Sequence, residues 1–547
     1  MNSTHLWYKN AVFYQVYVRA FYDRNGDGHG DLIGLTQKLG YLKDLGIDCL
    51  WLMPIYPSPL LDDGYDIADF YNIHPDYGTL QDFKQLISSA HERGIRIITD
   101  LVLNHTSDQH NWFLEARKGK DNPYHDYYVW RDDDQDYSEA RIIFLDIEES
   151  NWAWDDNAHQ YYWHRFYASQ PDLNYDNSSV RQEMLKVAKF WLDLGVDGFR
   201  ADAVPYLFER DGTNCENLPE THAYLKELRQ FIDRNYPGRI LLCEANQWPE
   251  EVREYFGEGD EFHMGFHFPL MPRIFMALCK EEISPIVWVL EKTPPIPENT
   301  QWTTFLRNHD ELTLEMVTEE ERQWMWQHYA PLPRMRLNLG IRRRLAPLLD
   351  NHRGKIELAF SLLFSLPGSP IIYYGDEIGM GDDIWLEDRN GVRTPMQWDN
   401  SPAAGFSPAD PERLYAPIIS NSEFNPQKVN VTNQTNDPGS LLSSIKKMIT
   451  LRKSFQSFGW GEFEWAFDTK QTQSKPIAAF YRSYLDEKLL IIQNLSSQAL
   501  TAEIPLSSSS ISLNEILGKS SNALINNHTL SIDLQPFDYH WFQVKSF

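Results

Sequence analysis

The chain has 547 residues, 42% of them hydrophobic, which is enough for two or three domains with buried cores and excludes a disordered protein. Its formal net charge is −28 at pH 7, and so acidic a surface repels nucleic-acid phosphates and anionic lipids. We therefore expect no nucleic acid and no membrane as partner, whereas a neutral ligand or a divalent cation fits the composition.

The N-terminal stretch MNSTHLWYKN lacks the apolar core of a secretion signal, and no stretch approaches the roughly 18 apolar residues of a membrane span. The four cysteines form neither a CxxC pair nor a zinc-binding spacing. Because Cys49 and Cys243 fall in apolar runs, we expect buried thiols in a reducing compartment, and hence a cytoplasmic protein. The chain is compatible with a homo-oligomer.

Short apolar runs alternate along the chain with segments of helical period, such as LIGLTQKLGYLKDLG and VRQEMLKVAKFWLDLG. The apolar runs are AVFYQVYV from Ala11, CLWLMP from Cys49, IRIITDLVLN from Ile95, GVDGFRADAV from Gly195, RILLCEA from Arg239, EFHMGFHF from Glu261, TTFLRNHD from Thr303 and SPIIYYGDE from Ser369. Strand–helix alternation predicts a parallel sheet with helical crossovers, and eight units predict closure into a (β/α)₈ barrel of the TIM type.

Two intervals are too long to be simple crossovers. Residues 106–172 are rich in Trp, Tyr and Asp and predict an inserted subdomain after the third strand. Residues of about 311–355 contain EEERQWMWQHYA and RMRLNLGIRRRLAPLL, which both have helical period and predict a helical insertion after the seventh strand. The barrel would then comprise 1–105 and 173–460. A C-terminal antiparallel β-sandwich is expected over 461–547, where alternating patterns become clear from about Gln471.

Polar side chains stand where several of the predicted strands end. They are Asp62, Asp63, Tyr65 and Asp66 after the second run, Asp100, Asn104 and His105 in the third, Arg200 and Asp202 in the fourth, Glu244 in the fifth, and His309 and Asp310 in the seventh. The active site of such a barrel lies at the carboxyl ends of its strands. A helix cap or a solvated loop explains any one of these residues, but packing alone does not produce the whole set.

Carboxylates gathered at one rim favour retaining glycoside cleavage, in which one carboxylate attacks the anomeric carbon and a carboxylic acid protonates the leaving oxygen. Arg200 lies two residues before Asp202, so both side chains face the same way, and the guanidinium is expected to lower the pKa of Asp202. Glu244 emerges from the apolar stretch LLCEA, which suits an acid that must stay protonated. Asp310 would grip sugar hydroxyls and support positive charge in the transition state.

The stretches DLVLNH (100–105), GFRADAV (198–204), LLCEAN (241–246) and FLRNHD (305–310), with QPDLN (170–174), resemble the signature regions of the α-amylase family of glycoside hydrolases. The resemblance implies that Asp202 is the nucleophile, Glu244 the general acid/base and Asp310 the transition-state stabiliser. It also implies a pocket for the non-reducing glucose that is lined by Tyr65, Asp66, His105, Gln170, Arg200, His309 and Arg393.

Longer stretches, among them DGYDIADFYNIHPDYGT and YYGDEIGMGDDIWLEDRNGVRTPMQW, resemble the branch of this family that interconverts maltose and trehalose. This resemblance implies an intramolecular glucosyl transfer with minor hydrolysis to glucose and with no organic cofactor. Isomerisation needs a pocket closed to water, because hydrolysis otherwise competes. The resemblance further implies that Arg141, Asn246 and Glu311 gate the pocket, with an Arg–Glu contact closing it; an ordinary salt bridge at the rim is the alternative.

Asp23, Asn25, Asp27 and Asp31 space oxygen ligands as a calcium loop does, although Gly34 stands where a full calcium loop carries Glu. The loop is either a variant site for Ca²⁺ or Mg²⁺ or an Asx-rich turn. The family resemblance implies a second structural metal site, for which a plain hydrogen-bond network is the alternative. Its ligands would be Asn104, Asp172 and Glu209 with the carbonyls of Tyr206 and Leu207.

The same carboxylates would serve a hydrolytic α-glucosidase or maltase, so the core motifs do not separate isomerisation from hydrolysis. Only the sequences of the two insertions favour isomerisation. A catalytically inactive scaffold that binds sugar or a partner protein is a third reading. It is disfavoured because all three carboxylates, both histidines and Arg200 are present.

Overall fold

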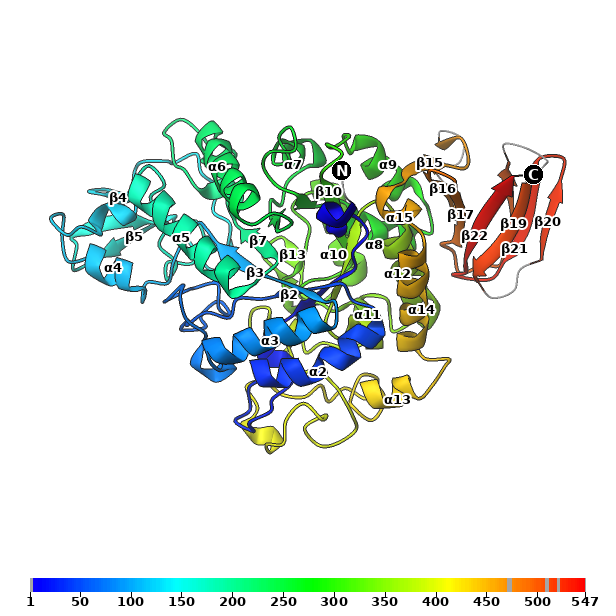
Figure 1. The fold of residues 1–547 in the computed structure, drawn as a ribbon, viewed down its shortest axis with the longest axis horizontal. Coiled ribbons are helices and arrows are strands. Elements are labelled where there is room, and N and C mark those ends of the chain that lie inside the picture. The colour runs from blue at the N-terminus through cyan, green and yellow to red at the C-terminus, as the bar shows by residue number, and fades with distance from the viewer. Residues whose placement is uncertain (1–2, 470–474, 507–510, 519–521, 547) are drawn as a thin grey trace.

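Eight parallel strands close into a barrel in the computed structural model, which describes residues 3–469, 475–506, 511–518 and 522–546. In order round the barrel they are β1 (Phe13–Val16), β14 (Ser369–Tyr373), β10 (Gln301–Phe305), β9 (Met264–Phe266), β8 (Ile240–Cys243), β7 (Gly198–Asp202), β3 (Arg96–Val102) and β2 (Cys49–Leu52). All their residues except Arg96 are buried, as expected for a parallel sheet covered by helices. Each strand overlaps one of the eight apolar runs, with β10 beginning two residues before its run, so the predicted (β/α)₈ barrel is confirmed (Figure 1).

Helices connect successive strands on the outside of the barrel (Figure 1). They include α2 (Leu32–Leu45), α3 (Leu80–Glu92), α5 (Ser178–Leu194), α6 (Pro219–Asn235), α7 (Pro249–Glu254), α8 (Leu270–Lys280), α9 (Ser284–Lys292) and α12 (Arg353–Ser365). Local sequence sets their ends: the Asp31 side chain caps α2, and Thr79 forms a capping box at the start of α3. Helix α2 ends at Gly46, whose φ of 99° lies in the left-handed region that glycine adopts without strain.

The interval after β3 forms a body of its own beside the barrel, at the left of Figure 1. It contains α4 (Asn111–Ala116) and a three-stranded antiparallel sheet in the order β4 (Trp130–Arg131), β6 (Gln160–Trp163), β5 (Trp152–Asp155). Its small core contains the aromatic rings of Tyr137, Trp152 and Trp163. A β-bridge between His105 and Asp172 joins the two ends of the interval, so it returns to the barrel rim where it left it. The exact domain boundaries stay a prediction.

The interval after β10 is only partly helical. Helix α10 (Glu319–Tyr329) lies in the predicted helical stretch, and the Thr318 capping box begins it. The prediction of a helix over RMRLNLGIRRRLAPLL is wrong for its central part, which forms the hairpin β12 (Arg336–Leu337) and β13 (Gly340–Ile341). Strand β13 pairs with β11 (Leu312–Thr313), so a pairing with a distant segment overrides the local helical period. Helix α11 (Leu345–Leu348) follows the hairpin.

Two antiparallel sheets form the C-terminal part, at the right of Figure 1. One has the order β15 (Glu462–Trp465), β16 (Ile477–Tyr484), β17 (Glu487–Asn494), β22 (Tyr539–Ser546), β19 (Ile511–Leu517); the other has the order β18 (Leu500–Pro505), β21 (Thr529–Leu534), β20 (Ala523–Asn526). The two sheets share one apolar core, so the β-sandwich is confirmed for the described residues. Gln471, near which we placed its start, lies outside them.

The sandwich docks on the barrel through the other face of its larger sheet. Alternate residues of β16 and β17, such as Phe480 and Leu489, belong to the apolar core of the barrel. Arg482 is buried at this interface and donates to the carbonyls of Ser365, Phe458 and Gly461. Because Ser365 is the last residue of α12, the guanidinium caps a carbonyl that the helix leaves free.

The four cysteines are free thiols, and Cys49 and Cys243 are buried, as expected; Cys215 is buried as well. The remaining one, Cys279, is partly exposed. Among the described residues, none of the helices combines the length and the apolar character needed to cross a membrane.

Candidate active site

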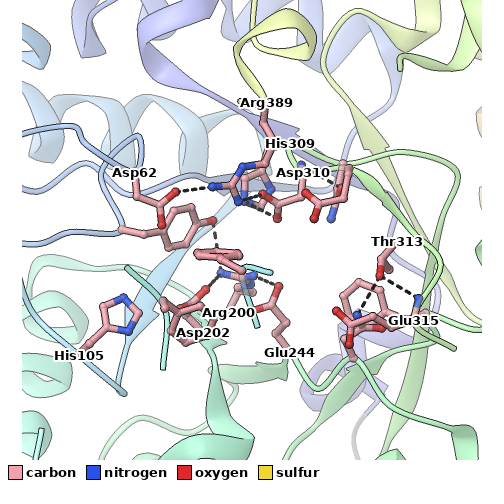
Figure 2. A pocket seen from close by; sticks show the side chains of 17 residues that line it. Asp62, His105, Arg200, Asp202, Glu244, His309, Asp310, Thr313, Glu315 and Arg389 are labelled. Atoms are coloured by element: carbon pink, nitrogen blue, oxygen red, sulfur yellow. Dashed lines mark hydrogen bonds and ion pairs between the residues drawn. The ribbon is translucent and has the colours of Figure 1, made fainter. Parts of the chain in front are cut away.

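A pocket lies at the carboxyl ends of the barrel strands, where the sequence predicted an active site (Figure 2). Asp202 is the last residue of β7, and Glu244 follows β8 directly. Between them Ala203 has a φ of 53°, in the left-handed region that residues other than glycine seldom adopt. Its backbone N–H donates to Oε2 of Glu244 at 3.3 Å, so the strained turn after β7 helps to place Glu244.

Arg200 stands between the two central carboxylates (Figure 2). Its Nη1 lies 2.5 Å from Oδ1 of Asp202 and 2.6 Å from Oδ1 of Asp100, and its Nη2 pairs with Glu244. Asp100 is in turn held by Trp51, whose indole N–H donates to it at 2.9 Å. The buried guanidinium therefore fixes Asp202 and Glu244 relative to each other, and Asp100 fixes the guanidinium.

Burial dominates the protonation of this pair. It raises the pKa of Asp202 to about 6, although Arg200 acts in the opposite direction. Arg200 thus acts on this pKa in the expected direction, but burial outweighs it; the arginine limits the rise and orients the carboxylate. Burial raises the pKa of Glu244 to about 8 against the pull of Arg200, with support from the charges of Asp202 and Asp310. Near pH 7 Asp202 is ionised and Glu244 protonated, which is the state that a retaining pair needs.

Asp310 has the opposite electrostatic setting. Its Oδ1 lies 3.0 Å from both Arg389 and Arg393, and its Oδ2 lies 3.0 Å from Nε2 of His309. Burial would raise the pKa of Asp310, but these partners outweigh burial and hold the pKa well below its usual range. Gln15 bonds to Nδ1 of His309 at 2.7 Å, and burial keeps the pKa of this ring well below its usual value. A neutral His309 can then donate from Nε2 to Asp310, which is a permanent anion in the pocket.

Four of the seven predicted substrate-binding residues line the pocket: Tyr65, His105, Arg200 and His309. The Tyr65 ring stacks on that of His309, with centroids 5.3 Å apart. Burial lowers the pKa of His105 to about 3, so its ring is neutral. Nε2 of His105 is buried and has no hydrogen-bond partner among the described residues, which leaves it available to a bound hydroxyl group.

The structure places the other three, Asp66, Gln170 and Arg393, behind the pocket wall. Asp66 accepts hydrogen bonds from Ser58 and from the backbone of residues 61 and 62, and so holds the loop after β2. Gln170 donates to Asp62 at 2.9 Å. Arg393 pairs with Asp63 and Asp310. These residues fix pocket groups without reaching the cavity themselves.

Two charged residues of the wall were not among the predicted site residues. Asp62 and Arg389 both line the pocket and lie 2.8 Å apart, and Arg389 also holds Asp310 (Figure 2). The Phe144 ring packs over the Arg389 guanidinium at 5.4 Å, and this ring also lines the pocket. Asp62 was expected at the rim after the second run but without a role, and the charged pair in DRNGVR is the sequence signal that could have pointed to Arg389.

The three predicted gating residues lie near the pocket but do not form the expected contact. Arg141 pairs with Glu315 and with Glu216, each at 2.8 Å, rather than with Glu311. Glu311 and Glu315 both line the pocket, as does Asn246, whose amide donates to Thr313 at 3.1 Å. The Arg141–Glu315 ion pair thus joins the insertion after β3 to the insertion after β10.

The predicted first metal loop is closed by its own hydrogen bonds. Asp23 accepts from the backbone of Gly26 and Gly28, and Asp31 accepts from the backbone of residues 24, 25 and 34. Burial raises the pKa of Asp31, and the charge of Asp23 adds to the rise. Two buried carboxylates with oxygen neighbours Asn25 and Asp27 are compatible with a hard cation, and equally with an Asx-rich turn.

The predicted second metal site has a clearer signature. Oδ1 of Asn104, Oδ2 of Asp172 and Oε1 of Glu209 are all buried, and none has a hydrogen-bond partner in the described part of the chain. Burial raises the pKa of Asp172 to about 8, and burial together with the nearby Asp172 charge raises the pKa of Glu209 well above its usual value. These orphaned oxygens fit Ca²⁺ or Mg²⁺. The described residues contain no group of three or more His, Cys, Asp or Glu side chains that could hold a metal ion. The predicted second site has only two such side chains, because its other ligands are the Asn104 amide and two backbone carbonyls.

Comparison with known proteins agrees with this geometry. Residues 15–338 and 341–461 match the family model of the alpha amylase catalytic domain. The chain is 62% identical over 461 residues to a trehalose synthase/amylase of Mycolicibacterium smegmatis, an alignment that covers 84% of this chain and 78% of that one. It is 54% identical over 548 residues to a trehalose synthase/amylase of Mycobacterium tuberculosis, covering 99% and 90%. The crystal structure of trehalulose synthase MutB from Pseudomonas mesoacidophila MX-45 superposes with a TM-score of 0.78 at 29% identity, covering 98% of this chain and 99% of that one.

Proposed function

Because this chain belongs to the alpha-amylase family, we propose that it interconverts maltose and trehalose by a retaining double displacement, with minor hydrolysis to glucose. The observation that carries the chemistry is the pair of Asp202 and Glu244, held by one guanidinium and differing in protonation near pH 7. The identity of 62% and 54% to proteins named trehalose synthase/amylase supports the choice of substrate.

In the first step a carboxylate oxygen of Asp202 attacks the anomeric carbon of the non-reducing glucose of maltose. Glu244 gives its proton to the glycosidic oxygen as the C–O bond breaks, which leaves free glucose in the pocket and a glucosyl ester on Asp202. Positive charge develops on the sugar ring in this transition state. The permanently ionised Asp310 is suited to stabilise that charge.

In the second step the freed glucose turns, and its anomeric hydroxyl attacks the glucosyl ester. Glu244, now ionised, takes the proton of that hydroxyl, the ester bond breaks, and trehalose leaves with Asp202 restored as a carboxylate. If water attacks instead, the same proton transfer yields a second glucose. Two inversions at one carbon retain the α configuration in either outcome.

The walls of the pocket support recognition of a glucose unit. Tyr65 and the pocket-lining phenylalanines offer flat apolar surfaces to the C–H faces of the ring. The Asp62–Arg389 pair and the free Nε2 of His105 offer acceptors and donors for hydroxyl groups. Arg141 and Glu315 join the two insertions near these groups, which supports a pocket that limits the entry of water.

A hydrolytic α-glucosidase would use the same carboxylates and remains the second candidate function. The proposed activity is tested by incubating the protein with pure maltose and following the products over time by proton NMR. Trehalose as the main product, with little glucose, is the expected result, and glucose alone would refute isomerisation. The Asp202→Asn variant keeps the shape of the side chain and removes the nucleophile, so it should form neither product.

We also propose that Asn104, Asp172 and Glu209, with the carbonyls of Tyr206 and Leu207, hold a structural Ca²⁺ or Mg²⁺ ion, and that the loop of Asp23, Asn25, Asp27 and Asp31 holds another. Such an ion would supply the positive charge that the buried carboxylates lack. Since Asp172 bridges to His105, the second site would tie the insertion after β3 to the barrel beside the pocket. No step of the reaction uses the metal.

The free cysteines support a reducing compartment, and we propose the cytoplasm. Burial raises the pKa of Cys49 and of Cys243 well above the usual thiol value. Such thiols are poor nucleophiles, so these two serve the packing of the barrel strands rather than the chemistry.

A further inference from the structure

Asn338, at the tip of the hairpin β12–β13, contacts both the pocket and the insertion after β3. Its side-chain amide donates to Oε1 of Glu311 at 3.2 Å, and Glu311 lines the pocket directly after Asp310. Its backbone N–H donates to Oδ2 of Asp146 at 2.7 Å, and Asp146 belongs to the insertion after β3. One residue therefore connects a pocket carboxylate with the opposite insertion.

The hairpin is fixed relative to the catalytic carboxylate Asp310. Strand β13 pairs with β11, which begins two residues after Asp310. A Cβ atom at Gly340 would lie 2.5 Å from Cγ of Glu311, so only glycine allows the hairpin to pack this closely. On the other side of the hairpin, Arg342 donates to the carbonyls of Leu386 and Asp388, next to Arg389. The tip of the hairpin is thus a fixed point beside the pocket.

The segment that meets this fixed point is anchored by Phe144, whose buried ring packs on Phe166 and Tyr167 with centroids 5.6 and 4.5 Å apart. Leu145 and Ile147, on either side of Asp146, are 54% and 50% exposed. Two residues before Asp146, the Phe144 ring lines the pocket and packs over Arg389. Residues 145–147 themselves are exposed, so the hydrogen bond of Asp146 holds this end of the segment against the hairpin and steadies Phe144 from one side.

We propose that Asn338 is a positioning residue: it holds Asp146, and with it Phe144, over the pocket, and it orients Glu311. This pair of contacts, which we call the latch, limits the access of water to the glucosyl enzyme. This inference rests on the proposed function. The glucosyl ester on Asp202 breaks in one of two ways: attack by the anomeric hydroxyl of glucose yields trehalose, and attack by water yields glucose. In both cases the proton goes to Glu244 and Asp202 leaves as a carboxylate, so the latch changes the ratio of the two products and not the chemistry.

Two variants separate the two contacts of Asn338, and a third serves as the control. Asp146→Ala removes the acceptor of the backbone N–H and leaves the Glu311 contact. Asn338→Gly removes the amide that holds Glu311 but tolerates the φ of 47° and keeps the backbone N–H. Asp133→Ala is the matched control, because Asp133 lies in the same insertion, is exposed, and accepts a hydrogen bond from the nearby backbone of Gln135.

The test combines the ratio of glucose to trehalose formed from maltose with hydrogen exchange of the backbone amide at position 338. Asp146→Ala should speed exchange of that amide by about threefold to tenfold, the effect of losing one hydrogen bond, and raise the glucose-to-trehalose ratio by a similar factor. Asn338→Gly should raise the ratio and the KM for maltose while exchange at position 338 stays as in the parent. Asp133→Ala should change neither quantity.

The inference would be overturned if Asp146→Ala and Asn338→Gly both melt at the parent temperature and both leave the product ratio unchanged. It would also be overturned if exchange at position 338 is unchanged in Asp146→Ala. A parent protein that makes only glucose would overturn the proposed function instead. Hydrogen exchange requires no substrate, so the latch itself is judged by a measurement that does not depend on which product the enzyme makes.

Discussion

The pH dependence of the first chemical step follows from the two unequal carboxyl groups. Asp202 must be ionised to attack, so kcat/KM is lost as the pH falls through its pKa of about 6. Glu244 must be protonated to assist departure of the leaving group, so kcat/KM is also lost as the pH rises through its pKa of about 8. We therefore expect a bell-shaped profile for maltose with a maximum near pH 7 and limbs that fall about tenfold per pH unit beyond each pKa.

The assignment of the alkaline limb to Glu244 is tested with a substrate that needs no acid. α-Glucosyl fluoride loses fluoride without protonation, so the Glu244→Gln variant should still form the glucosyl ester from it while it loses activity on maltose. The kcat/KM of this variant for the fluoride should keep the acid limb near pH 6 and show no alkaline limb near pH 8. The measurement is fluoride release by an ion-selective electrode between pH 4.5 and 9.5.

Two results would refute this reasoning. An alkaline limb that persists in Glu244→Gln with the fluoride substrate would mean that another group titrates there. A profile for maltose that keeps rising below pH 5 would mean that Asp202 is not governed by burial. The isosteric Glu244→Gln exchange preserves the volume of the side chain, and a melting temperature close to that of the parent shows that the comparison concerns ionisation.

Three further outcomes are expected. Arg389→Ala leaves Asp62 and Asp310 without a shared cation and should lower kcat/KM for maltose by about 100-fold, measured by initial rates, because two charge-assisted hydrogen bonds are lost. Dialysis against a chelator should lower the melting temperature by a few degrees and added Ca²⁺ should restore it, whereas Asp172→Asn should show a smaller response to Ca²⁺ because only the site at the Asp23 loop remains. Arg482→Ala removes the donor of three buried carbonyls and should destabilise the chain by about 3 kcal/mol in urea unfolding, with the pocket chemistry intact until the protein unfolds.

The barrel and its catalytic rim could be predicted because both depend on local information. A buried parallel strand is an apolar run, and the residue after that run is brought to the rim by the architecture itself. For this reason Asp202 and Glu244 were located from strand ends alone, and the structure brings both to Arg200. Asp62 follows the second run, but its partner Arg389 lies in a loop 327 positions further along the sequence. Local patterns carry no information about such a meeting.

Local patterns also misread the hairpin β12–β13 and miss the net direction of the pKa shift of Asp202. The stretch RMRLNLGIRRRLAPLL has helical spacing, but its centre gains more from pairing with β11 than from a local helix. A neighbouring arginine in the sequence suggested a lowered pKa for Asp202, but the extent of burial, which the sequence does not report, outweighs it. Both failures have one cause, which is that the deciding interaction comes from a distant part of the chain.

The same distinction bears on how the product is chosen. The bonds that are made and broken depend on Asp202, Glu244 and Arg200, which lie on β7 or directly after β8 and belong to neither insertion. The two contacts that join the insertions, Arg141 with Glu315 and Asp146 with the backbone of Asn338, span 174 and 192 positions and lie outside the barrel strands. Changes in these contacts can therefore shift the share of water in the second step while the first step is unaffected. A hydrolase and an isomerase with the same carboxylates would then differ in the stability of the contacts between their insertions. Hydrogen exchange measures that stability and product ratios measure its consequence, both separately from the rate of bond cleavage.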